Sequence, residues 1–173
     1  VTGHIIPWNY PMQVLGRSVG GALTMGNAVV LKPAEEACLT AIAFAQIAAE
    51  AGLPAGALNV VPGLGEEAGA ALTTHPGVRH ISFTGSVPVG QIIQRTAAQN
   101  VVPVTLELGG KSPQLVFADA DLDRALPFLV NAGIQNAGQT CSASSRILVE
   151  RRIHDQLLAR MAERYAALRV GPA

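Results

Sequence analysis

Two residues of this sequence form a candidate catalytic pair, a carboxylate and a thiol that both stand close to glycines. The chain reads LELGGK over 106–111 around Glu107 and GQTC over 138–141 up to Cys141. A cysteine thiol is a strong nucleophile and a carboxylate can activate water, while glycine lets a ligand approach the backbone closely. From spacing alone, a glycine turn and a buried structural cysteine would explain the same residues, because free cysteine is among the most buried residue types.

These two segments resemble the signature segments of the aldehyde dehydrogenase superfamily, and three more segments resemble that family in the same order. They are IPWNYP at 6–11, GNAVVLKPAE at 26–35 and FTGS at 83–86, which Gly90 follows. Five motifs in one order over nearly the whole chain are far more specific than any single motif. Members of this family run to several hundred residues, and the sequence begins with Val1 instead of Met. We therefore expect an internal piece of a longer enzyme.

The resemblance implies roles for three catalytic residues. The Cys141 thiolate would attack an aldehyde carbonyl, and the Asn9 side-chain amide and the Cys141 backbone N–H would donate hydrogen bonds to the oxyanion. Glu107 would then activate the water that hydrolyses the thioester to a carboxylic acid. Family branches that pass the acyl group to coenzyme A commonly lack this glutamate, so its presence favours hydrolysis. An asparagine in this place could instead be a helix cap.

The resemblance also implies NAD as cofactor, with NADP as a second possibility. Lys32 and Glu35 would bind the adenosine ribose hydroxyls, and an acidic residue there favours NAD because it would repel a 2′-phosphate. Helix amides after Gly85 would attract the pyrophosphate. A solvated ion pair and an ordinary strand-to-helix turn are the plainer interpretations of these motifs. The expected cofactor-binding residues are Ile6, Pro7, Trp8, Lys32, Pro33, Glu35, Gly65, Phe83, Thr84, Gly85, Ser86, Leu108 and Gly109.

Short apolar runs alternate with helical segments along the chain. We expect strands at 5–6, 28–31, 58–61, 80–83 and 101–106, and helices at 40–51, 66–73 and 87–98. Strands that are apolar on both faces and joined by helices predict an α/β fold, a doubly wound parallel sheet of Rossmann-like type. Ligands of such sheets lie at the carboxyl ends of the strands. We expect residues 1–109 to form the NAD-binding domain.

After Gly110 the pattern restarts, which predicts the start of a second α/β domain, the catalytic domain, over 110–173. Strands are expected at 114–117 and 147–150, with a helix that Asp121 caps between them. A last helix is expected at 154–168. Because most of this domain would be missing, we expect the isolated chain to be catalytically inactive.

Composition excludes several other classes of protein. The 173 residues carry 12 basic and 12 acidic side chains without a basic cluster, so we expect neither nucleic acid nor membrane as partner. The most apolar helical stretch, 41–49, is too short to span a bilayer. Two cysteines make no disulfide framework, and the four histidines have no metal-site spacing, so no metal is expected. The expected partner is a small-molecule aldehyde, in a cytoplasmic protein whose parent is a homo-oligomer.

Two other functions fit part of the pattern. A cysteine acyltransferase or hydrolase could use Cys141 and Glu107 without a nucleotide, and it would not bind NAD. A non-catalytic nucleotide-binding piece would have an unreactive Cys141. Labelling of the thiol with and without NAD separates these alternatives from the aldehyde dehydrogenase.

Overall fold

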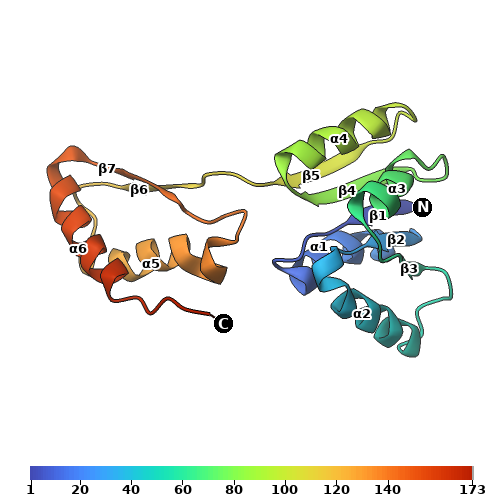
Figure 1. The fold of residues 1–173 in the computed structure, drawn as a ribbon, viewed down its shortest axis with the longest axis horizontal. Coiled ribbons are helices and arrows are strands. Elements are labelled where there is room, and N and C mark those ends of the chain that lie inside the picture. The colour runs from blue at the N-terminus through green and yellow to red at the C-terminus, as the bar shows by residue number, and fades with distance from the viewer. Residues whose placement is uncertain (173) are drawn as a thin grey trace. The chain divides into compact units, whose positions relative to one another are not determined.

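The chain divides into two compact units. The computed structural model describes residues 1–172, and the division falls between Leu108 and Gly109. Val1–Leu108 are called the first unit below, and the residues from Gly109 on the second unit. Both units contain parallel strands and helices (Figure 1). Cofactor binding by the first unit and catalysis by the second unit stay predictions, because a division into compact units does not test either role.

The first unit is built on a five-stranded parallel sheet with the order β3-β2-β1-β4-β5. From the central strand β1 the chain winds outward through β2 and β3, and then through β4 and β5 on the other side. This is the doubly wound α/β arrangement that the alternating pattern predicts. The strands are β1 Thr2–Ile5, β2 Val29–Lys32, β3 Leu58–Val60, β4 His80–Gly85 and β5 Val104–Leu108.

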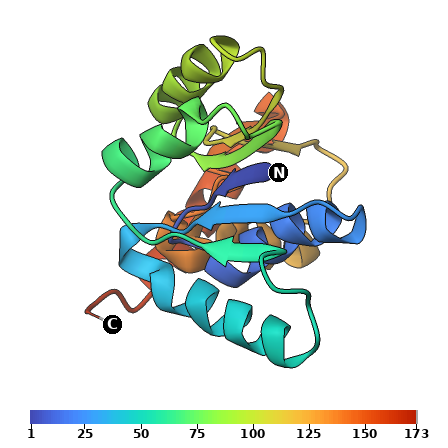
Figure 2. The same ribbon diagram turned by 90° about the vertical axis from the view of Figure 1, so that its right-hand side faces the viewer.

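Helices cover this sheet from two sides. Helices α1 (Pro11–Thr24) and α2 (Cys38–Glu50) lie on one face, and α3 (Ala70–Thr74) and α4 (Val87–Ala98) lie on the other, as Figure 2 shows. Each pair of helices packs over its own hydrophobic core. Leu15, Val19 and Leu31 are buried under the first pair, whereas Ile81, Phe83 and Ile93 are buried under the second.

One predicted helix of the first unit has a different form. The segment expected to be a helix over 66–73 is a wide π-helical turn, Gly65–Gly69, followed by the short α3. The Leu64 carbonyl accepts a hydrogen bond from the N–H of Gly69, five residues on. Apolar spacing does not distinguish this wider turn from an ordinary α-helical one.

The expectation that the strands are apolar on both faces is wrong for β4 and β5. Ile81 and Phe83 are buried beneath α3 and α4, but His80, Ser82 and Thr84 point to the opposite face and are only half-buried. The residues paired with this polar row in β5 are Thr105 and Glu107, and both are exposed. The physical reason is that the strands contribute apolar side chains to the core under α1 and α2 from β2 and β3 only, so this core does not reach β4 and β5.

The second unit pairs two parallel strands with two longer helices. Its elements are β6 Pro113–Val116, α5 Leu122–Ile134, the short 3-10 helices Gln135–Gly138 and Arg151–Ile153, β7 Arg146–Val149 and α6 His154–Ala166. Val116, Leu126, Leu129 and Leu157 are among the side chains of its core.

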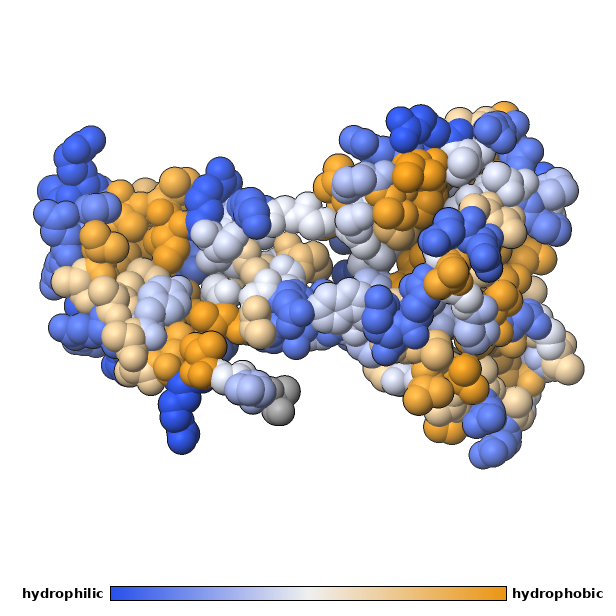
Figure 3. All heavy atoms as spheres, viewed as in Figure 1, coloured by the Kyte–Doolittle hydropathy of each residue, from blue (hydrophilic) through white to orange (hydrophobic). Residues whose placement is uncertain are grey.

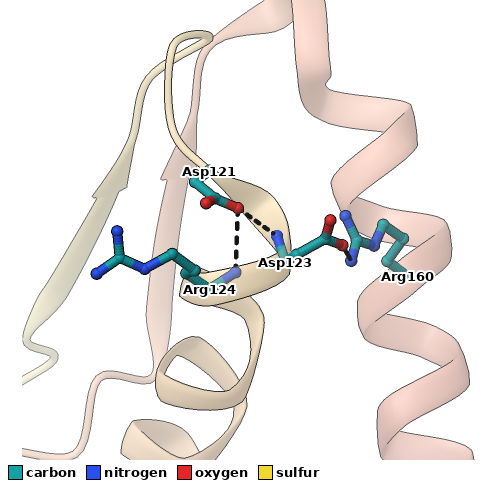
Figure 4. A network of polar contacts seen from close by, with 4 residues as sticks. All are labelled: Asp121, Asp123, Arg124 and Arg160. Carbon is teal, nitrogen blue, oxygen red and sulfur yellow. Dashed lines mark hydrogen bonds and ion pairs between the residues drawn. The ribbon is translucent and has the colours of Figure 1, made fainter.

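Polar contacts fix the two helices of the second unit. The Asp121 carboxylate accepts hydrogen bonds from the backbone N–H groups of Asp123 and Arg124, at 3.1 and 3.2 Å (Figure 4). Asp121 is therefore the N-cap of α5, as its sequence position predicts. Arg160 of α6 forms an ion pair with Asp123 of α5.

Apolar side chains also reach the surface (Figure 3). In the second unit Phe117 and Phe128 are 62% and 76% exposed, because two strands and two helices cannot cover all the apolar side chains of such a small unit. Across residues 1–172, none of the helices has both the length and the apolar character needed to cross a membrane.

Candidate active site

The residues expected at the site in the first unit gather at one edge of the sheet. Asn9 lies shortly after β1, Lys32 and Gly85 are the last residues of β2 and β4, and Glu107 is the last but one of β5. These strands are neighbours and parallel, so their carboxyl ends meet at the same edge, where open α/β sheets bind ligands. The structure brings these residues together, and their functions stay predictions.

Lys32, Glu35 and Gly65 form a contact cluster at this edge. The Lys32 ammonium lies 3.1 Å from Glu35 Oε1, and its side chain is 4% exposed against 38% for Glu35. The same carboxylate oxygen accepts a hydrogen bond from the Gly65 N–H at 2.7 Å. Because a buried cation needs a partner, the pair is a fixed part of the fold and differs from the solvated pair of the plainer interpretation. Pro33, the next residue after Lys32, is fully buried.

The charged form of Glu35 is favoured by its surroundings. A hydrogen bond from its own backbone N–H lowers the pKa of Glu35, and the Lys32 ammonium and the Gly65 N–H lower it further, although burial acts in the opposite direction. The carboxylate is therefore held as an acceptor at neutral pH. Such a group can accept hydrogen bonds from ribose hydroxyls.

Two glycines set the turn between β4 and α4. A Cβ on Gly85 would come within 2.5 Å of the Phe83 ring, and a Cβ on Gly90 within 2.8 Å of the Leu108 side chain. A side chain at Gly85 would displace the Phe83 ring, and one at Gly90 would push aside the end of the Leu108 side chain of β5, so glycine lets both pack closely here. Ser86 is the N-cap of α4 and makes no side-chain capping bond, while Pro88 lies in the first turn, where it needs no donor. The start of α4 thus directs backbone N–H groups toward the ligand edge.

The segment after β1 divides into a buried part and an exposed part. Ile6 is 3% exposed and belongs to the core under α1, whereas Trp8 is 47% exposed. Tyr10, and not Asn9, occupies the N-cap position of α1, and no side chain makes a capping bond there. Asn9 therefore lies one residue before the N-cap of this helix, and its role stays a prediction.

The Glu107 side chain lines a groove that the sequence analysis did not predict. This cavity of about 480 Å³ runs along the polar face of β1, β4 and β5, beside α1. Arg17, His4, His80 and Thr84 line it together with Glu107. The available signal is the alternation of polar residues along these strands, which the strongly apolar neighbouring positions obscure.

A buried histidine holds the floor of this groove. His4 is 2% exposed, with Nδ1 at 2.6 Å from Ser18 Oγ and Nε2 at 2.9 Å from Thr2 Oγ1. Ser18 donates in turn to Ser82 Oγ at 3.1 Å, which ties α1 to β4. Burial, and then the nearby His80, lower the pKa of His4 to about 4. At neutral pH this imidazole is therefore uncharged.

Cys141 lies on an exposed loop of the second unit. Asn136, Ala137 and Gly138 precede it with φ values of 51°, 55° and 76°, the left-handed region that residues with a Cβ avoid. After Cys141 the loop is anchored, because Gln114 donates to the carbonyls of Leu129 and Ser144 at 3.0 and 3.1 Å. The thiol thus stands between a strained segment and a fixed one. No group of three metal-ligating side chains occurs within the described part of the chain.

Comparisons with known proteins agree on one family. The sequence model described as "Aldehyde dehydrogenase family" matches residues 1–173. The hydroxyisobutyraldehyde dehydrogenase of Mycolicibacterium austroafricanum is 49% identical over 99% of this chain and 34% of its own length. Aldehyde dehydrogenase 1A1 of Mus musculus is 50% identical over 95% of this chain and 33% of its own length. The chain thus spans about a third of these relatives.

Solved structures with the same fold include a betaine aldehyde dehydrogenase from Staphylococcus aureus in complex with NAD+. It is 39% identical, with a TM-score of 0.95 over 98% of this chain and 34% of that one. An inferred aldehyde dehydrogenase from Burkholderia cenocepacia is 66% identical, with a TM-score of 0.96 over 99% of this chain and 36% of that one. At these identities the fold and the arrangement of the strand ends are shared.

Proposed function

Because the chain belongs to the aldehyde dehydrogenase family, we propose that it carries the cofactor site and the nucleophile of an NAD-dependent oxidation of an aldehyde to a carboxylic acid. The observation that carries the proposal is the cluster at the carboxyl edge of the sheet, where buried Lys32 is held by Glu35 and Gly65. This cluster stands where doubly wound folds bind dinucleotides. The activity is proposed for the longer protein of which such a chain is a part.

The residues of the first unit fit a dinucleotide. Lys32 and Glu35 offer a donor and an acceptor to ribose hydroxyls, and the start of α4 offers backbone N–H groups to the pyrophosphate. Gly85 and Gly90 leave no side chain over that turn. When bound, NAD+ supplies the acceptor for the hydride that leaves the substrate. A 2′-phosphate would meet the Glu35 carboxylate, so we propose NAD as the preferred cofactor.

The chemical steps fall to three side chains of the chain. Cys141 as thiolate forms a bond to the aldehyde carbon, and the Asn9 amide and the Cys141 N–H donate to the oxygen that becomes negative. After the oxidation, Glu107 takes a proton from water, which attacks the thioester carbon and releases the acid and the thiolate. The exposure of Glu107 and of the Cys141 thiol supports these roles, since both must meet substrate.

Assay of the longer protein with a panel of aldehydes and NAD+ tests the proposal. We expect NADH formation that Cys141→Ala abolishes and that Cys38→Ala, the matched control for the other cysteine, retains. Hydrolysis of an ester probe without NAD+, together with no NADH formed from any aldehyde, would favour a cysteine hydrolase instead. Binding of NAD+ with an unreactive Cys141 would favour a non-catalytic nucleotide-binding protein. Cytoplasmic location and a homo-oligomeric parent remain proposals, which cell fractionation and light scattering test.

A further inference from the structure

From the buried contacts of His4 we infer a positioning residue for the proposed reaction: His4 holds helix α1, and with it Asn9, against the strands that lead to Glu107. The inference rests on the proposed function, because it needs Asn9 as a donor to the oxyanion. It adds a residue that touches neither substrate nor cofactor and acts through the backbone that it fixes.

The contacts of His4 form one line from β1 through α1 to β4. His4 Nδ1 lies 2.6 Å from Ser18 Oγ of α1, and this hydroxyl donates to Ser82 Oγ of β4 at 3.1 Å. Because the single hydroxyl hydrogen of Ser18 goes to Ser82, its oxygen must accept, which places the ring proton on Nδ1. Nε2 then accepts from the Thr2 hydroxyl at 2.9 Å. Both ring nitrogens thus have a partner, and a satisfied buried network of this kind makes the structure around it rigid.

The start of α1 depends on this line, because the helix has little of its own to fix it. Tyr10 at the N-cap position makes no side-chain capping bond, and the first turn has no acidic side chain. Gly16 and Gly20 lie on either side of Ser18 and lower the helix propensity of α1. Apolar contacts also hold the helix on the sheet, but the hydrophobic effect has no direction. The hydrogen bonds at Ser18 therefore determine how α1 is turned and where it lies along β1.

The line joins the two parts of the first unit that must meet the same carbon atom. His4 of β1 and Ser82 of β4 are register partners on neighbouring strands, and further along β4 Thr84 pairs with Glu107 of β5. Asn9 lies directly before the N-cap of α1. In the proposed reaction Asn9 donates to the oxygen of the carbon that the water activated by Glu107 attacks. A misplacement of about 1 Å can cost on the order of 10²-fold in rate.

The His4 imidazole suits this task at neutral pH because it is uncharged. Burial, and then the nearby His80, lower the pKa of His4 to about 4. A neutral ring has one donor and one acceptor, which is what the contacts with Ser18 and Thr2 require.

The rate of the NADH burst, measured by stopped flow in the longer protein, tests the inference. The substrate is the aldehyde of the panel that the parent oxidises fastest. His4→Leu removes both hydrogen bonds and keeps a side chain of similar size, so the burst rate should fall by about 10-fold through misplacement of Asn9. The Kd for NAD+ should stay within about 3-fold of the parent. His4→Gln keeps a donor and an acceptor and should recover most of the burst rate.

Two further variants separate positioning from a general loss of stability. Ser18→Ala breaks the line at the helix and leaves the imidazole in place, so it should slow the burst as His4→Leu does. Thr73 is the matched control, because it is also buried and its hydroxyl donates to the Ala70 carbonyl at 3.0 Å, beneath the helices on the other face of the sheet. Thr73→Val should lower the Tm and leave the burst rate unchanged.

Double variants show whether His4 acts through Asn9. Asn9→Ala should slow the burst by about 10²–10³-fold, as the loss of an oxyanion donor does, and His4→Leu should then add no further loss. A further 10-fold loss, or a normal burst in His4→Leu and Ser18→Ala, would overturn the inference and leave the proposed function intact. If His4→Leu does not fold, Ser18→Ala with and without Asn9→Ala decides in the same way. A normal burst in Asn9→Ala would overturn the proposed role of Asn9 and the inference together.

Discussion

The Lys32 cluster of the first unit and the Cys141 loop of the second unit are held in place in different ways. Lys32 is buried, and Glu35 joins it to the Gly65 backbone through contacts of 3.1 and 2.7 Å. Cys141 is exposed, and the residues before it adopt left-handed conformations in which two side chains carry a Cβ. Beyond the thiol, Gln114 of β6 donates a hydrogen bond to the Ser144 carbonyl of the loop.

This difference fits the two roles proposed for the regions, cofactor binding at the Lys32 cluster and reaction with the substrate at Cys141. A group that binds a cofactor works best when it is already fixed, since ordering it on binding would cost affinity. A nucleophile must instead move between attack and release, and backbone strain of this kind persists only where the surroundings hold it. We therefore expect changes in the Lys32 cluster to alter affinity and preference, and changes around Cys141 to alter turnover.

The largest effect is expected at Cys141. In the longer protein, Cys141→Ala should remove all NAD-dependent aldehyde oxidation, because Cys38, the other cysteine, begins α2 and is not part of the expected site. Binding of NAD+, measured by calorimetry, should remain within about 3-fold of the parent. Loss of NAD+ binding together with turnover would contradict the separation of the two regions.

The next effect is expected at Glu107. Glu107→Gln keeps the shape of the side chain and removes the base, so deacylation should slow by about 10²–10⁴. Stopped-flow absorbance should show a burst of NADH followed by slow turnover. Glu36→Gln, on an exposed residue beside Glu35, is the control and should behave like the parent. If Glu107→Gln gave a normal burst and normal turnover, the assignment of the base would be wrong.

Acid should lower the stability of the first unit, because its buried His4 resists protonation in the folded state. The pKa of His4 is about 4 in the folded protein against an ordinary 6.5, so the imidazole is neutral in both states above pH 6.5. Below that pH the unfolded chain takes up a proton that the folded chain refuses. Stability should therefore fall between pH 6.5 and 4, by on the order of 2–3 kcal/mol.

Thermal unfolding of the longer protein measures this loss. His4→Gln removes the titrating group and keeps a polar side chain for Ser18 and Thr2, so the fall in Tm between pH 7 and pH 4.5 should become smaller. His154→Gln, on an exposed residue of the second unit, should leave the fall unchanged. An equal acid response in parent and His4→Gln would show that other groups cause it.

A smaller effect concerns the choice of cofactor. Glu35→Gln keeps an oxygen for Lys32 and Gly65 and removes the charge that repels a 2′-phosphate. We expect the ratio of kcat/KM for NAD over NADP to narrow by about 10-fold, the effect of a contact of roughly 1.4 kcal/mol. Glu36→Gln again serves as the control. An unchanged ratio would remove Glu35 from the ribose site.

The sequence predicts many of the structural features compared above, and there are physical reasons why it does not predict the others. The run at 28–31 predicted a parallel strand because burial on both sides of a backbone needs apolar residues, and Asp121 predicted a helix start. The run at 80–83 is a strand as well, although only Ile81 and Phe83 are buried in it. The left-handed residues before Cys141 gave no such signal, because asparagine and alanine also occur in helices. The groove at Arg17 arises from residues far apart in the chain, so the alternation of polar residues in β4 and β5 indicates only one of its walls.

The smallest expected effect tests the backbone strain in the segment before Cys141. Ala137 has φ of 55°, and glycine adopts this conformation without the penalty of about 1–2 kcal/mol that a Cβ brings. Part of the gain is lost to the greater freedom of glycine in the unfolded chain, so Ala137→Gly should stabilise the protein by about 0.5–1 kcal/mol.

The control for this variant is Ala132→Gly, inside α5, where glycine should destabilise by about 1 kcal/mol. Thermal unfolding of the two variants of the longer protein should thus give shifts of Tm in opposite directions. A loss of stability in both would mean that residues 136–138 do not keep the left-handed conformation in the intact protein. The contrast between a strained loop around Cys141 and a relaxed cluster around Lys32 would then have to be abandoned.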